Sequence, residues 1–519
     1  MKKNSPINSY LLILISVLMF TFTGCSDDFF NRQAGDRITP DQHYTNLIDA
    51  EVSRLGALVT LQDVMPQLIM LDGLRSDLMD VTPNANMYLN EINNQSISPN
   101  NPYTDASDLY KLIIDMNEVL ANLDKVAEND RDFDTHISYF YKGAMIGMRS
   151  WAYLTILRLY DEAAYIEDNL TSLPESLEIM SKDVLIDTLI NQLIPYIHDD
   201  SDGTETVEIK LSLYVNTKGL LGELYLEKND YVNAATYLKL ACESYSNNAS
   251  MLKVDRTYKD EAWSAIFMNA SGGFVENLSI IPFSSTEDQF NPLANWLGHD
   301  FHYLVKPSQI LVDSFMAQIQ LAGDTMDVYR GLGITFGVDT LTKVSETEFT
   351  TENYITKYAI DVGDPFSTDI IIQRAADLHL MLAEAYNRMG DEVSQGYALM
   401  LLNAGVNKES PKPPEFSKWK NNMGIRGRVY LAAKEIPEEI IGEQRTIMIE
   451  DLIIAERSLE LTFEGKRWFD LVRIAERRND PSYLADRVAA KFEGTSQYDA
   501  IHAKLMNPEN WYLDPPAVE

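Results

Sequence analysis

A helical spacing of apolar side chains recurs along most of this chain and constrains its fold more than any other feature. Apolar residues at intervals of three and four occupy 41–61, 106–127, 135–160, 181–197, 209–228, 231–246, 369–389 and 440–464. This spacing places the apolar side chains on one face of an α-helix. Alternation typical of β-strands is limited to short segments near 279–283 and 349–358. The sequence therefore predicts a mainly α fold with long irregular insertions near 62–105 and 270–360.

One pair of predicted helices, which follow each other within 209–246, has the residue pattern of a tetratricopeptide unit. Small, aromatic and large side chains stand where such a unit needs them, at Gly222, Tyr225, Tyr231, Ala234, Leu238 and Ala241. A looser copy begins at Ala383 and Tyr386. Since one unit cannot bury its hydrophobic face alone, we expect helix pairs near 135–160 and 440–475 to stack beside it in a tetratricopeptide-like superhelix. Ordinary antiparallel helices are the alternative.

The N-terminus has the pattern of an export signal. Two lysines precede an apolar run at 10–22, which is too short for a comfortable membrane span, and the run leads into Cys25. The segment resembles a bacterial lipoprotein signal, in which Cys25 becomes the acylated first residue; a plain secretory signal is the alternative. We predict three parts: a lipoprotein signal peptide at 1–24, an acylated tether at 25–39 and a single folded domain at 40–519.

The charge of the chain excludes one class of partner. Lys and Arg number 43 against 78 Asp and Glu, a formal net charge of −35. Such a field repels phosphate backbones, so we expect no nucleic acid as partner. The chain has two cysteines, Cys25 and Cys242, which offer neither a disulfide framework nor a cysteine-rich metal site. We predict no cofactor and no metal.

The segment at 454–473 is the most specific motif. It reads IAERSLELTFEGKRWFDLVR and closely resembles the signature of the SusD/RagB family, with its Glu-Arg pair, its Glu-Gly-x-Arg-Trp core and its Asp-Leu-x-Arg end. Segments at 373–385, 307–315 and 327–330 resemble the helix and the central segment that precede this signature. The chain departs from the family pattern at 403–407 and in a short C-terminal tail. The resemblance implies a SusD-like fold over the whole mature chain.

The signature also has a physical interpretation. Arg and Glu at offsets of three and four can pair across helix turns, and Gly465 suits a helix end in left-handed geometry. We therefore interpret the signature as scaffold, with a buried Trp468, and expect no catalytic role for Glu456, Glu460 or Glu464. Phosphate-binding loops, zinc-protease motifs and serine-hydrolase elbows do not occur in the sequence. We predict that the chain is not an enzyme.

The resemblance implies a function and a place in the cell. SusD-like proteins are lipid-anchored at the outer membrane, facing the cell exterior. There they capture a nutrient above a TonB-dependent, SusC-like barrel and deliver it for import. The predicted partners are thus this barrel, the membrane through acylated Cys25, and an oligosaccharide. A peptide ligand, a tetratricopeptide scaffold of the envelope and an enzyme remain as alternatives.

Sugar recognition needs aromatic faces and planar polar groups in irregular segments. The N-terminal insertion supplies the candidates Asp72, Arg75, Asp77, Asn86 and Tyr88, and the second insertion supplies Asn291, Trp296, His299 and Tyr303. Arg75 and Trp296 match the family's binding positions best. Their alternatives are a salt bridge with Asp72 or Asp77 for Arg75, and core packing for Trp296.

Overall fold

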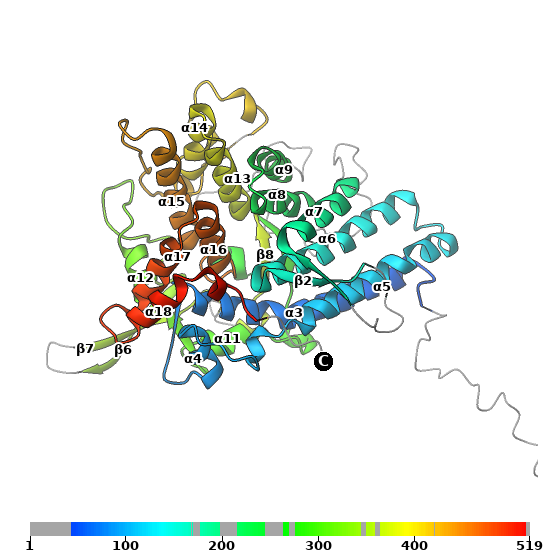
Figure 1. Ribbon diagram of the computed structural model, residues 1–519, viewed down its shortest axis with the longest axis horizontal. Helices are drawn as coiled ribbons and strands as arrows, with labels where there is room; N and C mark the ends of the chain where they lie inside the picture. Colours follow the sequence, from blue (N-terminus) through cyan, green and yellow to red (C-terminus); the bar gives the residue numbers. More distant parts are fainter. Residues whose placement is uncertain are drawn as a thin grey trace, which may run out of the picture.

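The structure is a computed structural model, and it describes residues 43–167, 169, 177–197, 215–243, 263–268, 276–343, 349–358, 364–419 and 421–514. The predicted signal peptide and the tether with Cys25 lie outside these residues. The prediction of a mainly α fold is confirmed, because helices form most of the described chain (Figure 1).

The elements follow one another from α3 to α18. The helices are α3 (Leu47–Arg75), α4 (Met87–Asn93), α5 (Ser107–Asn129), α6 (Thr135–Tyr160), α7 (Lys182–Leu193), α8 (Thr217–Glu227), α9 (Tyr231–Glu243), α10 (Ala265–Met268), α11 (Pro292–Leu297), α12 (Gln309–Met316), α13 (Ala375–Met389), α14 (Glu392–Leu402), α15 (Gly442–Glu460), α16 (Arg467–Arg478), α17 (Ser482–Ala489) and α18 (Tyr498–Leu505). The strands form antiparallel pairs, β1 (Met79–Val81) with β5 (Val305–Pro307), β2 (Glu162–Tyr165) with β3 (Glu178–Ser181), β4 (Asn277–Ile281) with β8 (Ile370–Arg374), and β6 (Phe336–Lys343) with β7 (Phe349–Ile355).

The helix pairs α8/α9 and α13/α14 stack as predicted. Each pair packs internally, α9 packs on α13, and α15 adds a further layer against α13 and α14. Gly222 explains the close approach of α8 and α9, because a Cβ atom there would lie 2.4 Å from Cγ of Leu238. Gly390 ends α13 with a φ of 82°, a left-handed conformation that glycine adopts without strain. In Figure 1 these pairs lie in the upper part of the molecule.

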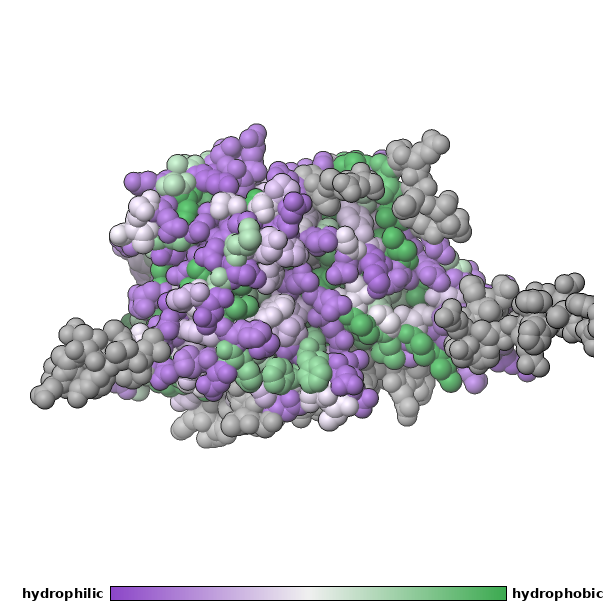
Figure 2. Space-filling model, turned by 90° about the horizontal axis from the view of Figure 1, so that it is seen from below, coloured by the Kyte–Doolittle hydropathy of each residue, from purple (hydrophilic) through white to green (hydrophobic). Residues whose placement is uncertain are grey.

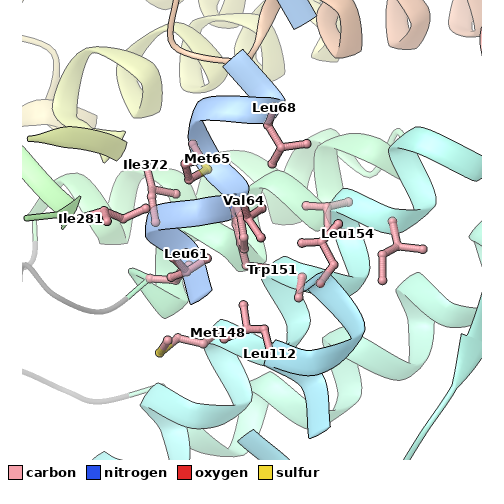
Figure 3. Close-up of a cluster of buried hydrophobic side chains, with 14 of the residues drawn as sticks. Leu61, Val64, Met65, Leu68, Leu112, Met148, Trp151, Leu154, Ile281 and Ile372 are labelled. Carbon is pink, nitrogen blue, oxygen red and sulfur yellow. The ribbon is translucent and has the colours of Figure 1, made fainter. Parts of the chain in front are cut away.

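The main hydrophobic core lies where α3 crosses α5 and α6. Figure 3 shows side chains from these helices packed together with two isoleucines, from β4 and β8. The labelled residues are Leu61, Val64, Met65, Leu68, Leu112, Met148, Trp151, Leu154, Ile281 and Ile372. The strands thus tie segments that are distant in sequence into the helical core.

Two predicted boundaries are wrong. Helix α3 continues beyond 61 to Arg75, so about the first third of the expected N-terminal insertion belongs to this helix. Nearly every residue from Val64 to Arg75 is buried, which removes the one-sided spacing that identifies a helix. The predicted helix at 369–389 begins only at Ala375, because Ile370–Arg374 is a buried strand. Its β-branched residues favour an extended conformation.

Candidate functional site

The signature segment forms a closed network of ion pairs. Glu460, at the end of α15, accepts hydrogen bonds from Arg330 at 2.7 Å, from Arg374 at 2.8 Å and from Arg428. All four side chains are buried. Burial opposes ionisation of Glu460, but the surrounding guanidinium groups hold its pKa at about 2. A carboxylate so enclosed by cations is not placed to meet a substrate.

The neighbouring acids of the signature are paired in the same way. Glu456 contacts Arg330 at 2.8 Å and Arg426 at 2.5 Å. Glu464 contacts Lys357 at 2.7 Å. Trp468 is buried, and Gly465 has a φ of 73° at the corner between α15 and α16. The interpretation of the signature as scaffold is therefore confirmed.

The structure places Arg75 in the interior, which corrects its prediction as a ligand-binding residue. Its guanidinium carbon lies 3.9 Å from the ring centre of Trp468, and Nη2 donates to the carbonyl oxygens of Asn510 at 3.2 Å and Trp511 at 2.9 Å. The alternative of a salt bridge with Asp72 or Asp77 is also wrong. Arg75 instead joins the end of α3 to the C-terminal segment.

Asp72 and Asp77 are buried too, and each contacts the start of α16. Oδ1 of Asp72 accepts from the backbone N–H of Trp468 at 2.7 Å. Asp77 forms a bidentate pair with Arg467, at 2.8 and 2.7 Å. Burial raises the pKa of Asp72 to about 7, since no cation pairs with it directly. Both predictions as ligand contacts are corrected, because these carboxylates position a helix.

The two insertions meet, although more than 160 residues separate them in sequence. Strand β1 pairs with β5 in the register Asp80 to Lys306. Beyond the strands, the Thr82 hydroxyl donates to the carbonyl oxygen of Tyr303, and Nδ2 of Asn84 donates to that of His302 at 3.1 Å. The segment before α4 and the segment after α11 are therefore held side by side.

Aromatic side chains gather where the insertions meet. Tyr103 packs edge-on against Trp296 in α11, with ring centres 6.3 Å apart. Phe366 lies 5.3 Å from Phe301 and 6.1 Å from Phe290, ring centre to ring centre. Phe290 is 53% exposed and Phe301 43% exposed, and the other three rings are half-buried. We call these five residues the aromatic face.

The aromatic face belongs to the lower side of the molecule. Helices α4 and α11 form the lowest part of Figure 1, on the side away from the stacked helix pairs. Figure 2 views the molecule from below, and hydrophobic side chains lie there among hydrophilic ones. The side chain of Asn86, at the start of α4, hydrogen-bonds Tyr103 and adds an exposed amide beside the rings.

The other predicted residues divide between surface and interior. Tyr88 is half-buried on α4. His299 is also half-buried, between the rings of Tyr303 at 5.2 Å and Tyr354 at 5.1 Å. Tyr303 itself is buried, and its hydroxyl donates to the carbonyl oxygen of Asn353 at 2.8 Å.

Asn291 is a structural residue, which corrects its prediction as a ligand contact. It is buried and begins α11, where its side-chain oxygen accepts from the N–H of Leu293 at 2.9 Å. Its Nδ2 donates to the carbonyl oxygen of Thr368 at 2.7 Å. Both of these hydrogen bonds hold the buried side chain at the helix start.

Four members of the aromatic face were not predicted from sequence: Tyr103, Phe290, Phe301 and Phe366. Three of them lie inside the predicted insertions, so a search for every aromatic residue there would have found them. Phe366 comes from a separate short segment that joins α11 because the N–H of Asn291 donates to its carbonyl oxygen at 2.8 Å. No local sequence pattern predicts that contact.

The described part of the chain offers neither a metal site nor a membrane span. No group of three or more His, Cys, Asp or Glu residues among the described residues is placed to hold an ion. Likewise, none of the helices in the described ranges is long and apolar enough to cross a membrane.

Comparison with known proteins agrees with the fold and the signature. A model of the SusD family matches residues 282–514. A SusD superfamily protein from Bacteroides vulgatus ATCC 8482 has a TM-score of 0.66 and 15% identity, over 92% of this chain and 96% of that one. A SusD homolog from Bacteroides thetaiotaomicron VPI-5482 has a TM-score of 0.63 and 15% identity, over 90% and 94%.

Another solved structure, a laminarin-binding SusD-like protein, has a TM-score of 0.56 and 18% identity, over 88% of this chain and 96% of that one. No curated protein matches the sequence. The family match contains the signature whose arginines and glutamates build the buried corner. The resemblance of the signature to the SusD/RagB family is confirmed, since the model of the SusD family matches residues 282–514 and the fold is that of solved SusD-like structures.

Proposed function

We propose that this protein captures an oligosaccharide at the cell surface and delivers it to a TonB-dependent, SusC-like outer-membrane barrel. One observation carries the proposal: the aromatic face, in which two groups of packed rings from three separate segments, Tyr103 with Trp296 and Phe366 with Phe290 and Phe301, meet around α11 and two of the rings are exposed. Apolar groups that a fold leaves uncovered in this way mark interaction sites.

The chemistry of the face suits a sugar. A pyranose ring presents C–H groups on one side, which pack on an aromatic ring, and hydroxyl groups at its edge, which pair with amides. Asn86 is exposed beside Tyr103, and although its Oδ1 accepts from the N–H of Leu89 at 3.0 Å, its amide keeps further hydrogen-bonding capacity for a sugar. The laminarin-binding neighbour supports a glycan over a peptide as ligand, since it shares this fold.

Binding without turnover is part of the proposal. The acids of the signature are enclosed by arginines and so are not placed to act on a bound glycan. Incubation of the pure protein with each bound glycan should therefore leave the chain length of that glycan unchanged, as measured by chromatography of the products.

Anchoring through acylated Cys25 would hold the protein at the outer membrane, facing outward, beside the barrel. Two experiments test this part. A Cys25→Ala variant should leave the membrane fraction, and the wild-type protein extracted in detergent should retain a TonB-dependent barrel through purification. A wild-type protein without lipid or without the barrel would contradict it.

Affinity electrophoresis in gels that contain one polysaccharide each tests the binding function. The mature chain without its lipidation site, Ser26–Glu519, should be retarded in at least one glycan gel. Trp296→Ala should weaken the affinity for that glycan by about 10-fold or more, which appears as reduced retardation. The reason is that stacked rings at the centre of a site carry much of the binding energy.

Tyr237→Ala is a matched control for this variant. Tyr237 is a half-buried ring that stacks on Tyr225 in the α8/α9 pair, away from the aromatic face. Its removal should leave retardation unchanged. Equal retardation of wild type and Trp296→Ala would contradict the proposed site, and capture of peptides alone would replace glycan by peptide in the proposal.

A further inference from the structure

The three segments that build the aromatic face carry charge of one sign only. Residues 82–106, 282–303 and 364–369 contain no Lys and no Arg. Their acidic residues are Glu91, Asp105, Glu287, Asp288, Asp300, Asp364 and Asp369. Asp300 is 96% exposed. The surroundings of the rings are thus strongly negative, in a protein whose formal net charge is already −35.

Lysines from other elements do not neutralise this negative charge near the rings. Lys306 in β5 pairs with Glu352 at 3.2 Å. Lys491 is largely buried, where Nζ donates to Oδ1 of Asn93, and Lys504 donates to the carbonyl oxygen of Gln95. Both of these contacts lie at the C-terminal end of α4, whereas Tyr103 contacts its N-terminal end through Asn86.

The acids are distributed in a way that does not suit a cationic ligand either. Glu91 accepts from the Ser98 hydroxyl at 2.7 Å, Asp105 from Ser107 at 2.6 Å, and Asp364 from Ser285 at 2.5 Å. Glu91 and Asp105 thus fix their own loops, and Asp364 ties its segment to the turn at Ser285. These acids do not converge on one point either, since no group of three or more His, Cys, Asp or Glu among the described residues is placed to hold an ion.

We infer that the ligand of the aromatic face is an uncharged oligosaccharide, and that uronate-rich or sulfated glycans are rejected. This inference rests on the proposed function and names the class of ligand. A polyanion would bring its charges beside several carboxylates with no cation to pair, and like charges held together across an interface discriminate strongly against the wrong partner. A neutral sugar carries no charge for these carboxylates to repel, and its hydroxyl groups can hydrogen-bond to amides beside the rings.

Calorimetry with a matched pair of glycans tests the inference. The mature chain is titrated with neutral polysaccharides (laminarin, xyloglucan, galactomannan, arabinan) and with polygalacturonate, alginate and chondroitin sulfate. The best neutral ligand is then carboxymethylated, which keeps the backbone and adds charge. We expect the derivative to bind at least about 10-fold more weakly at about 0.1 M salt, and to recover at about 1 M salt, where the Debye length falls from about 10 Å to about 3 Å.

A charge-reversal variant sharpens the test. Asp300→Lys should strengthen binding of the carboxymethylated glycan by about 3-fold or more and change binding of the neutral parent by less than about 2-fold, because Asp300 is exposed and contacts only His299, at 3.6 Å. Glu128→Lys is the control, with the same change of charge at the far end of α5, about 30 Å along the helix from its start beside Tyr103. It should leave both affinities unchanged.

The outcomes separate this inference from the proposed function. Tight binding of an anionic glycan that Phe301→Ala abolishes would overturn the inference and leave the proposed function standing. Binding of basic peptides alone would overturn both. A protein that binds no member of the panel would contradict the proposed function, and the inference would fall with it.

Discussion

The buried corner between α15 and α16 and the aromatic face treat charge in opposite ways. In the corner, arginines and glutamates from distant segments neutralise one another pair by pair and exclude water. At the aromatic face, the segments that carry the rings contain acidic residues and no Lys or Arg, and two of the rings are exposed. The comparison shows that charge which is enclosed and balanced by the opposite charge fixes a fold, whereas charge of one sign beside exposed rings remains able to act on a ligand.

The corner explains why the signature is so rich in charge without being an active site. A buried ion pair repays the cost of removing its charges from water only when its geometry is good and all groups have partners. Glu460 has three arginine partners, and these arginines come from segments far apart in the chain. The network therefore locks several segments in one arrangement.

Loss of Glu460 should have the largest effect. Glu460→Gln leaves three buried guanidinium groups with one anion fewer, and we expect the free energy of unfolding to fall by about 3–5 kcal/mol. Denaturant titration measures the change. Glu443→Gln is the control, since Glu443 is 68% exposed in its pair with Arg388, and it should cost less than about 1 kcal/mol. Equal losses would contradict the distinction between enclosed and exposed charge.

A variant at Arg75 tests whether this residue belongs to the enclosed scaffold and not to the binding face. We expect Arg75→Ala to lower the free energy of unfolding by about 2–4 kcal/mol, because it removes the contact with Trp468 and two hydrogen bonds to the C-terminal segment. Glycan affinity, measured by calorimetry below the unfolding transition, should stay within about 2-fold of wild type. A folded variant that no longer binds would return Arg75 to the site.

Asp72 gives a smaller, pH-dependent effect. Its pKa rises from 3.8 to about 7 in the folded protein, so its contribution to stability is complete below pH 3.8 and is lost as the pH rises towards 7. Asp72→Asn keeps a side-chain oxygen that can accept the hydrogen bond from the N–H of Trp468. Because the asparagine does not ionise, the variant does not lose this stability as the pH rises. Between about pH 6 and about pH 8, wild type should lose about 1 kcal/mol relative to the variant. Parallel unfolding curves of the two proteins over this range would contradict the assignment.

The sequence predicts the enclosed region better than the open one, for a physical reason. The signature, Gly222 and the α8/α9 and α13/α14 pairs follow from residue types at fixed spacing, because helix geometry converts spacing into contact. The same logic fails for Arg75. Its helix is buried on all sides, so neither periodicity nor charge reveals that this arginine faces the interior.

The aromatic face depends on contacts between segments that are distant in sequence. Trp296 was predicted, but its partner Tyr103 lies almost two hundred residues earlier, and Phe366 belongs to a turn more than sixty residues later. Whether such a ring is exposed depends on which loops cover it, and that is decided only when β1 pairs with β5 and Asn291 bonds Phe366.

Hydrogen exchange with and without the bound glycan tests the central claim most directly, because it locates the ligand without any mutation. We predict that amides at 84–104, 290–303 and 364–369 exchange more slowly in the complex, while those at 454–473 are unaffected. Protection confined to the signature or to the stacked helix pairs, with the aromatic face unchanged, would contradict the division of the molecule into an enclosed scaffold and an open binding face.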